Sequence, residues 1–417
     1  MKPQTTKPLK VLISAYSCEP GKGSERGVGW GVVREMAKRH DVWVLTRPDE
    51  SKDAIEAEMA CNPMPNLHFV YFTLPFWQDS LRLGQSGAMQ IHYYLWQIQA
   101  YFVARRLHKE IGFDLSHHVT FVKYSSPCFL SLLPIPLVWG PVGGAESAPG
   151  PFWKDFDLRA RAYEWARIIV RSLGEIDPFV KLTARRSAAV RATTKDTAKK
   201  LYEMGADSVH ILPESGLPDS DISTLSHYPI PINEPVKFIS LGRLLHWKGF
   251  HLGVQAFAAA NLPNSEYWLC GEGPEREKLE ALAKDLGVGD RVKFFGLLPR
   301  EACLNKLQDC HALVHPSLHD SGGWVCLEAM AAGRPVLCLD LGGPGVQVTE
   351  DVGFKVAAHT PEQVIADLAA AMKKLAENPH LCAEMGGIGR ALIQKKHSWK
   401  VKGEELSQLY EKVSVNA

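Results

Sequence analysis

Two cationic residues stand close together in a turn that follows an apolar run. The run 238–241 leads through a glycine to Arg243 and Lys248, and a helical pattern begins after Gly249. A guanidinium can bind two phosphate oxygens at once, an ammonium adds a point charge, and a helix N-terminus attracts anions. The spacing therefore favours a diphosphate site, although a solvated basic turn explains the same residues about as well.

A second group of chemically capable residues lies between 315 and 335. The Ser-Gly-Gly run 321–323 precedes a helical pattern, where free backbone N–H groups can bind phosphate or carboxylate. Asp320 stands before this helix, and Glu328 stands about two turns into it. A buried Glu328 needs hydrogen-bond partners, which sugar or ribose hydroxyls could supply. Taken singly, the two carboxylates are more simply explained as a helix cap and a structural glutamate.

The first half of the chain offers a glycine-rich loop and a histidine pair. Clustered glycines follow the first apolar run at 21, 23, 27 and 29, and they let a backbone approach a ligand closely. A plain flexible turn is the alternative for this loop. His117 and His118 stand near the end of a later apolar run, where a histidine is more often a bonded core residue than a catalyst.

Short apolar runs alternate with helical patterns through most of the sequence. Such alternation is typical of an α/β protein whose parallel sheets carry helices on both faces. In the first half, we expect a helix at 29–39 and strands at 10–15, 42–46, 68–72, 115–120 and 137–139. In the second half, we expect strands at 237–241, 267–270, 292–295, 312–315 and 336–339, and helices at 253–260, 275–286, 301–308, 324–332 and 398–413.

A stretch without periodicity, rich in proline, serine and aspartate, runs from Pro213 to Pro235 and indicates a linker. Ligands of doubly wound sheets bind at the carboxyl ends of the strands, and clefts between domains commonly hold small molecules. We therefore expect an N-terminal Rossmann-like domain at 1–218, a linker at 219–235, a C-terminal Rossmann-like domain at 236–395 and a closing helix at 396–417 that crosses back to the first domain.

Composition excludes several classes of protein. The 417 residues include 47 basic and 46 acidic ones, so the net charge is +1, whereas a nucleic-acid binder normally shows a clear basic excess. The nine cysteines are scattered and never spaced as CxxC, which is typical of reduced thiols rather than of a disulfide framework or a zinc site. No stretch approaches the ~18 apolar residues of a membrane-spanning helix. We expect a cytoplasmic protein without a nucleic-acid partner.

The chain carries, in this order, G-R-x4-K-G at 242–249, G-E-G-P at 271–274, Asp320 and Glu328 followed by A-M-A-A-G-R-P, and Ser398-Trp399. Together these motifs resemble those of the retaining glycosyltransferases of the GT-B fold, family GT4. The resemblance extends over essentially the whole chain and is most specific between Phe238 and Gly345. It implies two Rossmann-like doubly wound domains that face each other across a cleft, with the donor on the C-terminal side and the acceptor on the N-terminal side.

The resemblance implies roles for four residues of the second half. Arg243 and Lys248 match the pair that binds the donor diphosphate and steadies the leaving nucleotide. Glu328 matches the glutamate that holds the nucleotide ribose. Asp320 stands near the donor sugar, where the family usually has a longer glutamate, and we assign it to the catalytic group.

The resemblance also implies roles for residues of the two glycine-rich loops and for a histidine. Gly322, Gly323 and Trp324 fall where family backbone amides approach the donor diphosphate, although the family usually has an aromatic residue in place of Gly322. Many relatives carry a histidine at the end of the strand that reads Val-Trp-Gly at 138–140 here. Because none stands there, we assign its catalytic role to His117 or His118, with backbone groups of the glycine turn as the alternative. The family's glycine loop matches Gly21, Gly23, Ser24 and Gly27.

Neither a metal nor a cofactor is expected beyond the nucleotide-sugar co-substrate. Asp219 and Asp221 form a D-x-D, the metal-binding pattern of the other large glycosyltransferase fold, but they lie in the expected linker and fit a capping or turn sequence. The cationic pair and helix dipoles can take up the charge of the leaving diphosphate without a metal. The basic and aromatic stretches 93–108 and 159–171 fit helices that bury an apolar face. The alternative for them is peripheral contact with the inner face of the membrane, which would suit a lipid-linked acceptor.

The resemblance implies transfer, with retention, of a hexose-type sugar from a UDP- or GDP-linked donor to a hydroxyl of a glycan or glycolipid acceptor. The acceptor hydroxyl would attack on the face that the nucleotide leaves. One alternative is a nucleotide-sugar epimerase on the same architecture, and another is a non-catalytic nucleotide-sugar binding protein. A dinucleotide-dependent oxidoreductase is disfavoured, because the glycines after the first strand do not follow G-x-G-x-x-G.

Overall fold

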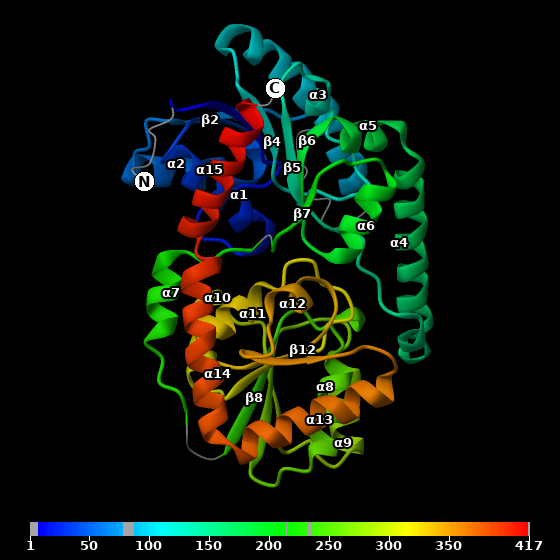
Figure 1. Cartoon of the computed structure of the whole chain (residues 1–417). Coiled ribbons are helices and arrows are strands. Elements are labelled where there is room, and N and C mark those ends of the chain that lie inside the picture. Colours follow the sequence, from blue (N-terminus) through cyan, green and yellow to red (C-terminus); the bar gives the residue numbers. More distant parts are fainter. Residues whose placement is uncertain (1–6, 78–86, 214, 232–234, 416–417) are drawn as a thin grey trace. The chain divides into compact units, whose positions relative to one another are not determined.

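A computed structural model describes residues 7–77, 87–213, 215–231 and 235–415 of the chain (Figure 1). The chain divides into two compact units, which are treated separately below. Unit 1 consists of Met1–Ala145, Arg167–Gly216 and Trp399–Ala417, and unit 2 of Glu146–Ala166 and Leu217–Ser398.

The unit boundaries differ from the expected domains in two places. Residues 146–166 group with unit 2 instead of the N-terminal domain, and the division falls inside helix α4 (Leu158–Ile176). The linker expected at 219–235 is wrong over its first part, because Asp219–Ser226 form helix α7. Residues 232–234 of that linker lie outside the described residues. A cleft between the domains stays a prediction.

In the described part of unit 1, seven parallel strands form one sheet in the order β3-β2-β1-β4-β5-β6-β7. The strands are β1 (Lys10–Ser14), β2 (Asp41–Thr46), β3 (Leu67–Tyr71), β4 (Leu115–His118), β5 (Leu137–Val142), β6 (Ser187–Ala192) and β7 (Val209–Ile211). The helices are α1 (Ser24–Ala37), α2 (Pro48–Cys61), α3 (Gly87–Ile111), η2 (Phe129–Leu132), α5 (Pro178–Arg186), α6 (Lys195–Glu203) and α15 (Trp399–Val415).

In the described part of unit 2, six parallel strands form a second sheet in the order β10-β9-β8-β11-β12-β13. The strands are β8 (Val236–Leu241), β9 (Ser265–Cys270), β10 (Val292–Gly296), β11 (Ala312–His315), β12 (Val336–Leu339) and β13 (Gly353–Val356). Besides α7, the helical segments are η3 (Gly150–Asp155), η4 (His246–Lys248), α8 (Phe250–Ala260), α9 (Arg276–Asp285), α10 (Arg300–Gln308), α11 (Trp324–Ala331), α12 (Gly342–Gln347), α13 (Pro361–Glu377), α14 (Pro379–Leu392) and η5 (Ile393–His397).

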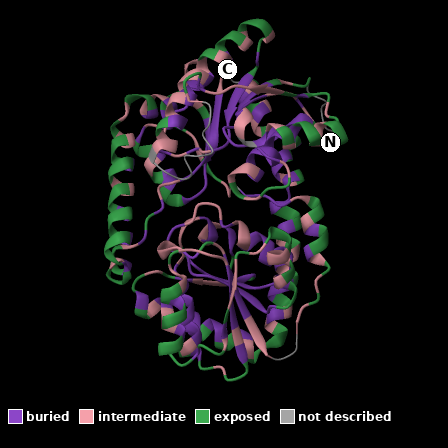
Figure 2. Ribbon diagram, turned by 180° about the vertical axis from the view of Figure 1, so that it is seen from behind, coloured by how far each residue is buried: buried purple, intermediate pink, exposed green. Residues whose placement is uncertain are grey.

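Burial explains why the apolar runs became strands. Figure 2 shows both sheets buried, with the exposed residues mainly on the outer faces of the helices. In β8, neighbouring Phe238 and Ile239 pack into different apolar clusters, because successive side chains of a strand point to opposite faces of the sheet. Helices cover both faces, so a parallel strand reads as a continuous apolar run. The segment 146–166 joins unit 2 because Phe152 and Phe156 pack into one of these clusters.

Elements with weak apolar patterns were not predicted from the sequence. Strand β6 reads Ser-Ala-Ala-Val-Arg-Ala and β13 reads Gly-Phe-Lys-Val, so neither shows a long apolar run. Strand β5 continues through Gly140-Pro141 to Val142, three residues past its predicted end. Its pairing with β6 is irregular between Trp139 and Val142, which is how the strand accommodates a proline without an N–H.

Helix α15 packs closely on α1 at a glycine of unit 1. The side chain of Trp399, 7% exposed, lies so near Gly31 that a Cβ at this position would overlap its ring. We expect Gly31→Ala to lower the free energy of unfolding of unit 1 by about 1–3 kcal/mol, because the ring and α15 must move. Denaturant unfolding followed by circular dichroism measures the loss.

Gly387→Ala is the matched control. Gly387 is an exposed residue inside α14, and no atom lies within 4 Å of an added Cβ. Alanine there should be neutral or stabilising by up to about 1 kcal/mol, since it favours the helix. Equal unfolding midpoints for wild type and Gly31→Ala would contradict the close packing of α15 on α1.

Candidate functional site

The strand order of unit 2 creates the place where the predicted donor residues meet. Strands β8 and β11 are neighbours, and the order along the sheet reverses between them, which makes their carboxyl ends a topological switch point. The loops that follow the two strands contact each other, since Leu318 N donates to Trp247 O at 2.8 Å. Gly249 has φ +66°, and a Cβ there would overlap the carbonyl of Pro316. Only glycine allows the two loops to approach so closely.

An ion pair joins the two loops. Lys248 Nζ donates to Asp320 Oδ2 at 2.5 Å, and each side chain is 19% exposed. His315, at the end of β11, donates from Nε2 to the same oxygen at 3.1 Å. Lys248, assigned to the donor diphosphate, and Asp320, assigned to the catalytic group, therefore lie together. Because an ammonium has three donors, the one bond to Asp320 leaves Lys248 able to bind a further anion.

The second oxygen of Asp320 faces the start of α11. Gly322 N and Gly323 N donate to Asp320 Oδ1 at 3.3 and 3.4 Å. Gly323 adopts φ +53° before Trp324 begins the helix, and Gln347 hydrogen bonds to the carbonyl of Gly322. The backbone amides predicted to approach a diphosphate thus already bind one carboxylate. This arrangement is an anion site built from a helix N-terminus and a lysine.

Electrostatics keep Asp320 ionised. Burial alone would raise the pKa of its carboxyl, but Lys248 and the hydrogen bond from His315 together bring this pKa well below the ordinary value. Burial in turn lowers the pKa of His315. An aspartate held in this way accepts hydrogen bonds at any physiological pH and has no proton to give.

Arg243 lies in the same loop as Lys248, and its side chain is exposed. The G-E-G-P turn after β9 supports this loop, since Leu244 N donates to Glu272 O at 2.9 Å. Gly271 and Gly273 both have positive φ, and a Cβ on either would overlap a carbonyl of the loop, on Gly242 and Leu244 respectively. The turn that contributes to the family resemblance therefore positions the arginine loop.

Glu328 has a cationic partner that the sequence did not reveal. Arg300, at the start of α10, donates to Glu328 Oε1 at 2.7 Å and to Asp221 Oδ2 at 2.8 Å. Asp221 belongs to the D-x-D pattern, for which a capping or turn sequence was predicted, and it lies in the first turn of α7. Burial raises the pKa of Glu328 to about 7 although Arg300 opposes this. Glu328 therefore changes its charge near neutral pH.

The buried carboxylate of Glu164, in the segment 146–166, hydrogen bonds to both loops. Glu164, on α4, accepts from His246 Nε2 at 3.1 Å and from His319 Nε2 at 3.0 Å. The ring of Trp247 stacks between those of His319 and Tyr163, at 5.3 and 5.0 Å between centroids. Sequence reasoning missed this cluster, because 82 and 155 residues separate Glu164 from its two partners.

The predicted glycine loop belongs to unit 1 and leads into α1. Gly21 has φ +72°, Gly23 precedes the helix, and Gly27 N donates to Gly23 O at 3.4 Å. Ser24, the first helical residue, has φ +56°. In the first turn of α1, the half-buried Glu25 accepts from Phe121 N at 3.0 Å, and burial raises its pKa.

The catalytic assignment of His117 and His118 is contradicted by their surroundings. Both side chains are buried in the sheet of unit 1. His117 Nε2 donates to Gly140 O at 2.6 Å, so Nδ1 accepts from the hydroxyl of Tyr410. His118 Nε2 hydrogen bonds with the Tyr93 hydroxyl at 2.7 Å. Burial lowers the pKa of His117 to about 3 and that of His118 to about 4, so both stay neutral core residues.

Neither a group of metal-binding side chains nor a membrane-spanning helix is found among the described residues. Within them, no group of three or more His, Cys, Asp or Glu side chains that could hold a metal ion is found. Over the same part of the chain, every helix is too short or too polar to cross a membrane. Metal independence itself stays a prediction.

Known proteins resemble the chain in sequence and in fold. Residues 227–391 match the family described as glycosyl transferases group 1. The lipopolysaccharide core biosynthesis glycosyltransferase LpsD of Rhizobium meliloti (strain 1021) is 27% identical over 233 residues, 52% of this chain and 62% of that protein. Sucrose-phosphate synthase from Thermosynechococcus elongatus has a TM-score of 0.63 at 19% identity, over 99% of this chain and 100% of that one. Anabaena HepE in complex with UDP-glucose has a TM-score of 0.61 at 17% identity, over 97% and 100% of the two chains.

The structural matches establish the fold, and the family match covers only residues 227–391. The chain spans between 44% and 62% of the length of the first curated relatives that it matches, and the matched family segment lies within the stretch that forms most of unit 2. The two parallel sheets are those of two Rossmann-like domains. The chain thus has the GT-B fold, and its residues 227–391 match the family described as glycosyl transferases group 1.

Proposed function

We propose that the chain is a retaining glycosyltransferase that transfers a hexose-type sugar from a nucleotide-sugar donor to a glycan or glycolipid hydroxyl. The observation that carries the proposal is the anion site at the switch point of unit 2, where Lys248 and the amides of Gly322 and Gly323 converge. Two relatives support the substrate classes by their names, since HepE binds UDP-glucose and LpsD acts in lipopolysaccharide core biosynthesis. We place the activity in the cytoplasm, at the inner face of the membrane.

The donor diphosphate would bind Lys248 and Arg243. Lys248 keeps two donors after its bond to Asp320, and Arg243 can add a bidentate contact from the same loop. As the bond from the anomeric carbon to the diphosphate breaks, negative charge grows on the leaving oxygen, and these fixed cations stabilise it. The acceptor hydroxyl then bonds to the anomeric carbon on the face that the nucleotide leaves, and its proton passes to the leaving phosphate.

Asp320 acts in this scheme as a positioning residue rather than as the nucleophile. Both of its oxygens already accept hydrogen bonds, from Lys248 and His315 on one side and from backbone amides on the other. Its contacts fix the ammonium of Lys248 and the start of α11 in one geometry. The shorter side chain, compared with the family's usual glutamate, keeps the carboxylate against the helix N-terminus.

The first prediction concerns nucleotide release. Purified protein is offered UDP-glucose, UDP-galactose, UDP-N-acetylglucosamine and GDP-mannose singly, in EDTA, and the released nucleotide is measured. We expect slow release from one donor and a loss of about 100-fold in Lys248→Ala, because one fixed charge on the leaving group is removed.

Lys284→Ala is the matched control, since Lys284 is an exposed residue of α9 in the same unit. It should release nucleotide like wild type. Conversion of the donor to its epimer without release would identify the alternative enzyme, an epimerase. Donor binding without turnover in any acceptor pool would identify a binding protein, and a requirement for added metal would contradict the metal-independent mechanism.

The second prediction concerns pH. Ribose hydroxyls donate more strongly to an ionised carboxylate than to a neutral one, by about 1 kcal/mol. Glu328, whose pKa is about 7, must lose its proton to bind ribose well, so binding strengthens as the pH rises. The Kd for a nucleotide sugar should therefore fall about three- to fourfold between pH 6 and pH 8. Calorimetry over this range measures it with a ligand whose diphosphate does not titrate there.

Glu328→Gln should bind the nucleotide sugar with no pH dependence over the same range. The matched control is Glu277→Gln, at an exposed position of α9, which should keep the wild-type pH profile. A change in Kd of the same size in Glu328→Gln would assign the titration to another group and remove the ribose role.

Helix α4 supports peripheral contact with an anionic membrane. The expectation that this stretch buries its apolar face is wrong, because Ile169, Leu173 and Ile176 are 57–70% exposed. Their spacing of four and three residues puts them on one face, which Leu158 and Trp165 continue. Arg159 and Arg161, both exposed, follow Leu158 along the helix. Apolar side chains beside arginines suit the interface of an anionic lipid surface.

The third prediction tests this contact by co-sedimentation with vesicles of phosphatidylcholine containing phosphatidylglycerol. We expect binding to these vesicles, weaker binding to phosphatidylcholine alone, and a loss of at least tenfold in Ile169→Asp/Leu173→Asp. Leu297→Asp, at an exposed position of unit 2, should bind like wild type. Self-association through the same residues without lipid, or equal binding by the double variant, would contradict a membrane role.

A further inference from the structure

Arg300 of unit 2 shares one nitrogen atom between two carboxylates. Its Nη2 donates to Glu328 Oε1 at 2.7 Å and to Asp221 Oδ2 at 2.8 Å. The three side chains come from different helices, since Asp221 lies in the first turn of α7, Arg300 begins α10 and Glu328 lies within α11. The side chain of Glu328 is 11% exposed, that of Asp221 20% and that of Arg300 38%, so the network runs from a buried carboxylate to the surface.

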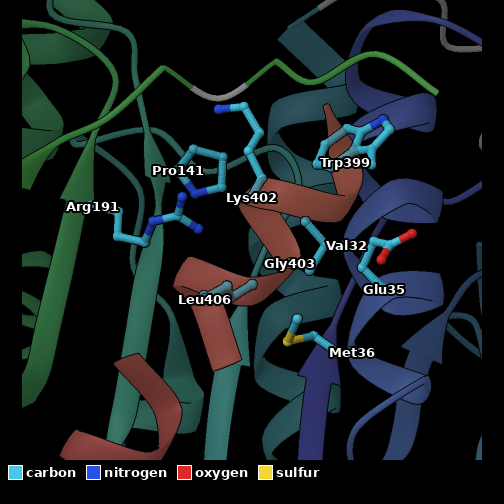
Figure 3. A pocket seen from close by; sticks show the side chains of 9 residues that line it. All are labelled: Val32, Glu35, Met36, Pro141, Arg191, Trp399, Lys402, Gly403 and Leu406. Atoms are coloured by element: carbon cyan, nitrogen blue, oxygen red, sulfur yellow. The ribbon is translucent and has the colours of Figure 1, made fainter. Parts of the chain in front are cut away.

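Other arginines of the fold have different surroundings. In unit 1, Arg191 points toward α15 beside a small pocket (Figure 3), and burial lowers its pKa although Tyr410 and Glu405 of that helix act against this. In unit 2, Arg334 donates to three backbone carbonyls. Arg300 instead bonds to two ionisable groups, so its charge influences the protonation of both.

Asp221 and Glu328 compete for the charge of Arg300. A guanidinium in a protein stays protonated, so two negative charges face one positive charge when both acids are ionised. Glu328 is the more buried acid and loses more of its hydration. Burial raises the pKa of Glu328 to about 7, Arg300 opposes this rise, and Asp221 adds to it. Asp221 thus works against the ionisation of Glu328.

The elements around α11 carry further charged or titratable side chains: Asp219 on α7, Cys303 on α10, His315 on β11, Cys338 on β12, Arg390 on α14, and Lys395, Lys396 and His397 on η5. Burial keeps both of these thiols neutral by raising their pKa. His315 hydrogen bonds to Asp320, and Arg390 donates to two backbone carbonyls. The pKa of Glu328 is set by its burial and by the arginine and aspartate described above.

We propose that Asp221 is a positioning residue for the nucleotide ribose, which acts through Arg300 and limits how firmly this arginine holds Glu328. The inference rests on the ribose role of Glu328 in the proposed function. When Asp221 loses its charge, Arg300 pairs with Glu328 alone, and Glu328 ionises at a lower pH. Asp221, from the D-x-D pattern, thus makes nucleotide binding respond to pH near neutrality.

The first measurement is the titration of the Glu328 carboxyl in the full chain without nucleotide. It is followed by NMR of carbon-13-labelled glutamate, and Glu328→Gln assigns the signal. We expect a midpoint near pH 7 in wild type, a lower one in Asp221→Asn and a higher one in Arg300→Met. The first variant removes a negative neighbour and the second removes a positive one. An unchanged midpoint in Asp221→Asn would overturn the proposal.

The second measurement is the Kd for a nucleotide sugar, determined by calorimetry at pH 6 and pH 8. In wild type, we expect the Kd to fall about three- to fourfold over this range. In Asp221→Asn, it should fall by less than about twofold, because much of Glu328 is already ionised at pH 6. A fall of the wild-type size in this variant would refute the role of Asp221.

Asp219→Asn is the matched control. Asp219 lies in the same first turn of α7 and is exposed, and its charge is not among those that shift the pKa of Glu328. Loss of its carboxylate tests for a general effect of charge at this helix N-terminus. This variant should behave like wild type in both measurements. A shift in Asp219→Asn as large as that in Asp221→Asn would overturn the specific contact.

The two measurements separate this inference from the proposed function. If the midpoint falls in Asp221→Asn but no nucleotide sugar binds to wild type, the proposed function fails and the ribose role of Asp221 fails with it. If nucleotide sugars bind with a response that depends on Glu328 but not on Asp221, the proposed function stands and this inference is refuted. Asp221→Ser also lacks the charge and must behave like Asp221→Asn, which keeps the test open if one variant does not fold.

Discussion

The carboxylate of Asp320 balances the positive charge at the switch point of unit 2, and the local geometry depends on this balance. Parallel strands β8 and β11 end side by side, so the lysine of one loop and the N-terminus of the helix after the other are forced close together. Two positive groups would repel each other there without an anion. Asp320 binds both, and glycines at 249 and 323 allow the backbone to approach closely enough.

Two buried carboxylates of the segment 146–166, Glu146 and Glu164, hydrogen bond to the loops that carry Asp320 and Lys248. Glu146 accepts from Ser321 Oγ at 2.9 Å, and Glu164 accepts from His246 and His319. Of these donors, His319 and Ser321 are the sequence neighbours of Asp320. His246 lies two residues before Lys248. Buried carboxylates are stable only with such partners, so the packing of this segment and the geometry of the anion site are coupled.

In unit 1, buried polar groups attach the closing helix α15 to the sheet. His117 links the carbonyl of Gly140 in β5 to the hydroxyl of Tyr410 in α15, so a neutral ring fastens the closing helix to the sheet. Arg191 lies beside this link and lowers the pKa of His117 further. The same helix is held on its other side by the ring of Trp399 against Gly31. Polar and apolar contacts together therefore fix α15 in unit 1.

The sequence predicted the strands with strong apolar runs and the helices beside them. These features depend on short-range periodicity and on glycine positions, which a single chain displays directly. Thus β11 and β12 have the predicted bounds, whereas the contacts of Lys248 and Gly323 with Asp320 were not predicted. Tertiary structure alone decided which polar groups are buried and which partners they have. The burial of His117, the pairing of Glu328 with Arg300 and the exposed face of α4 all depend on segments distant in sequence, whose packing no local pattern encodes.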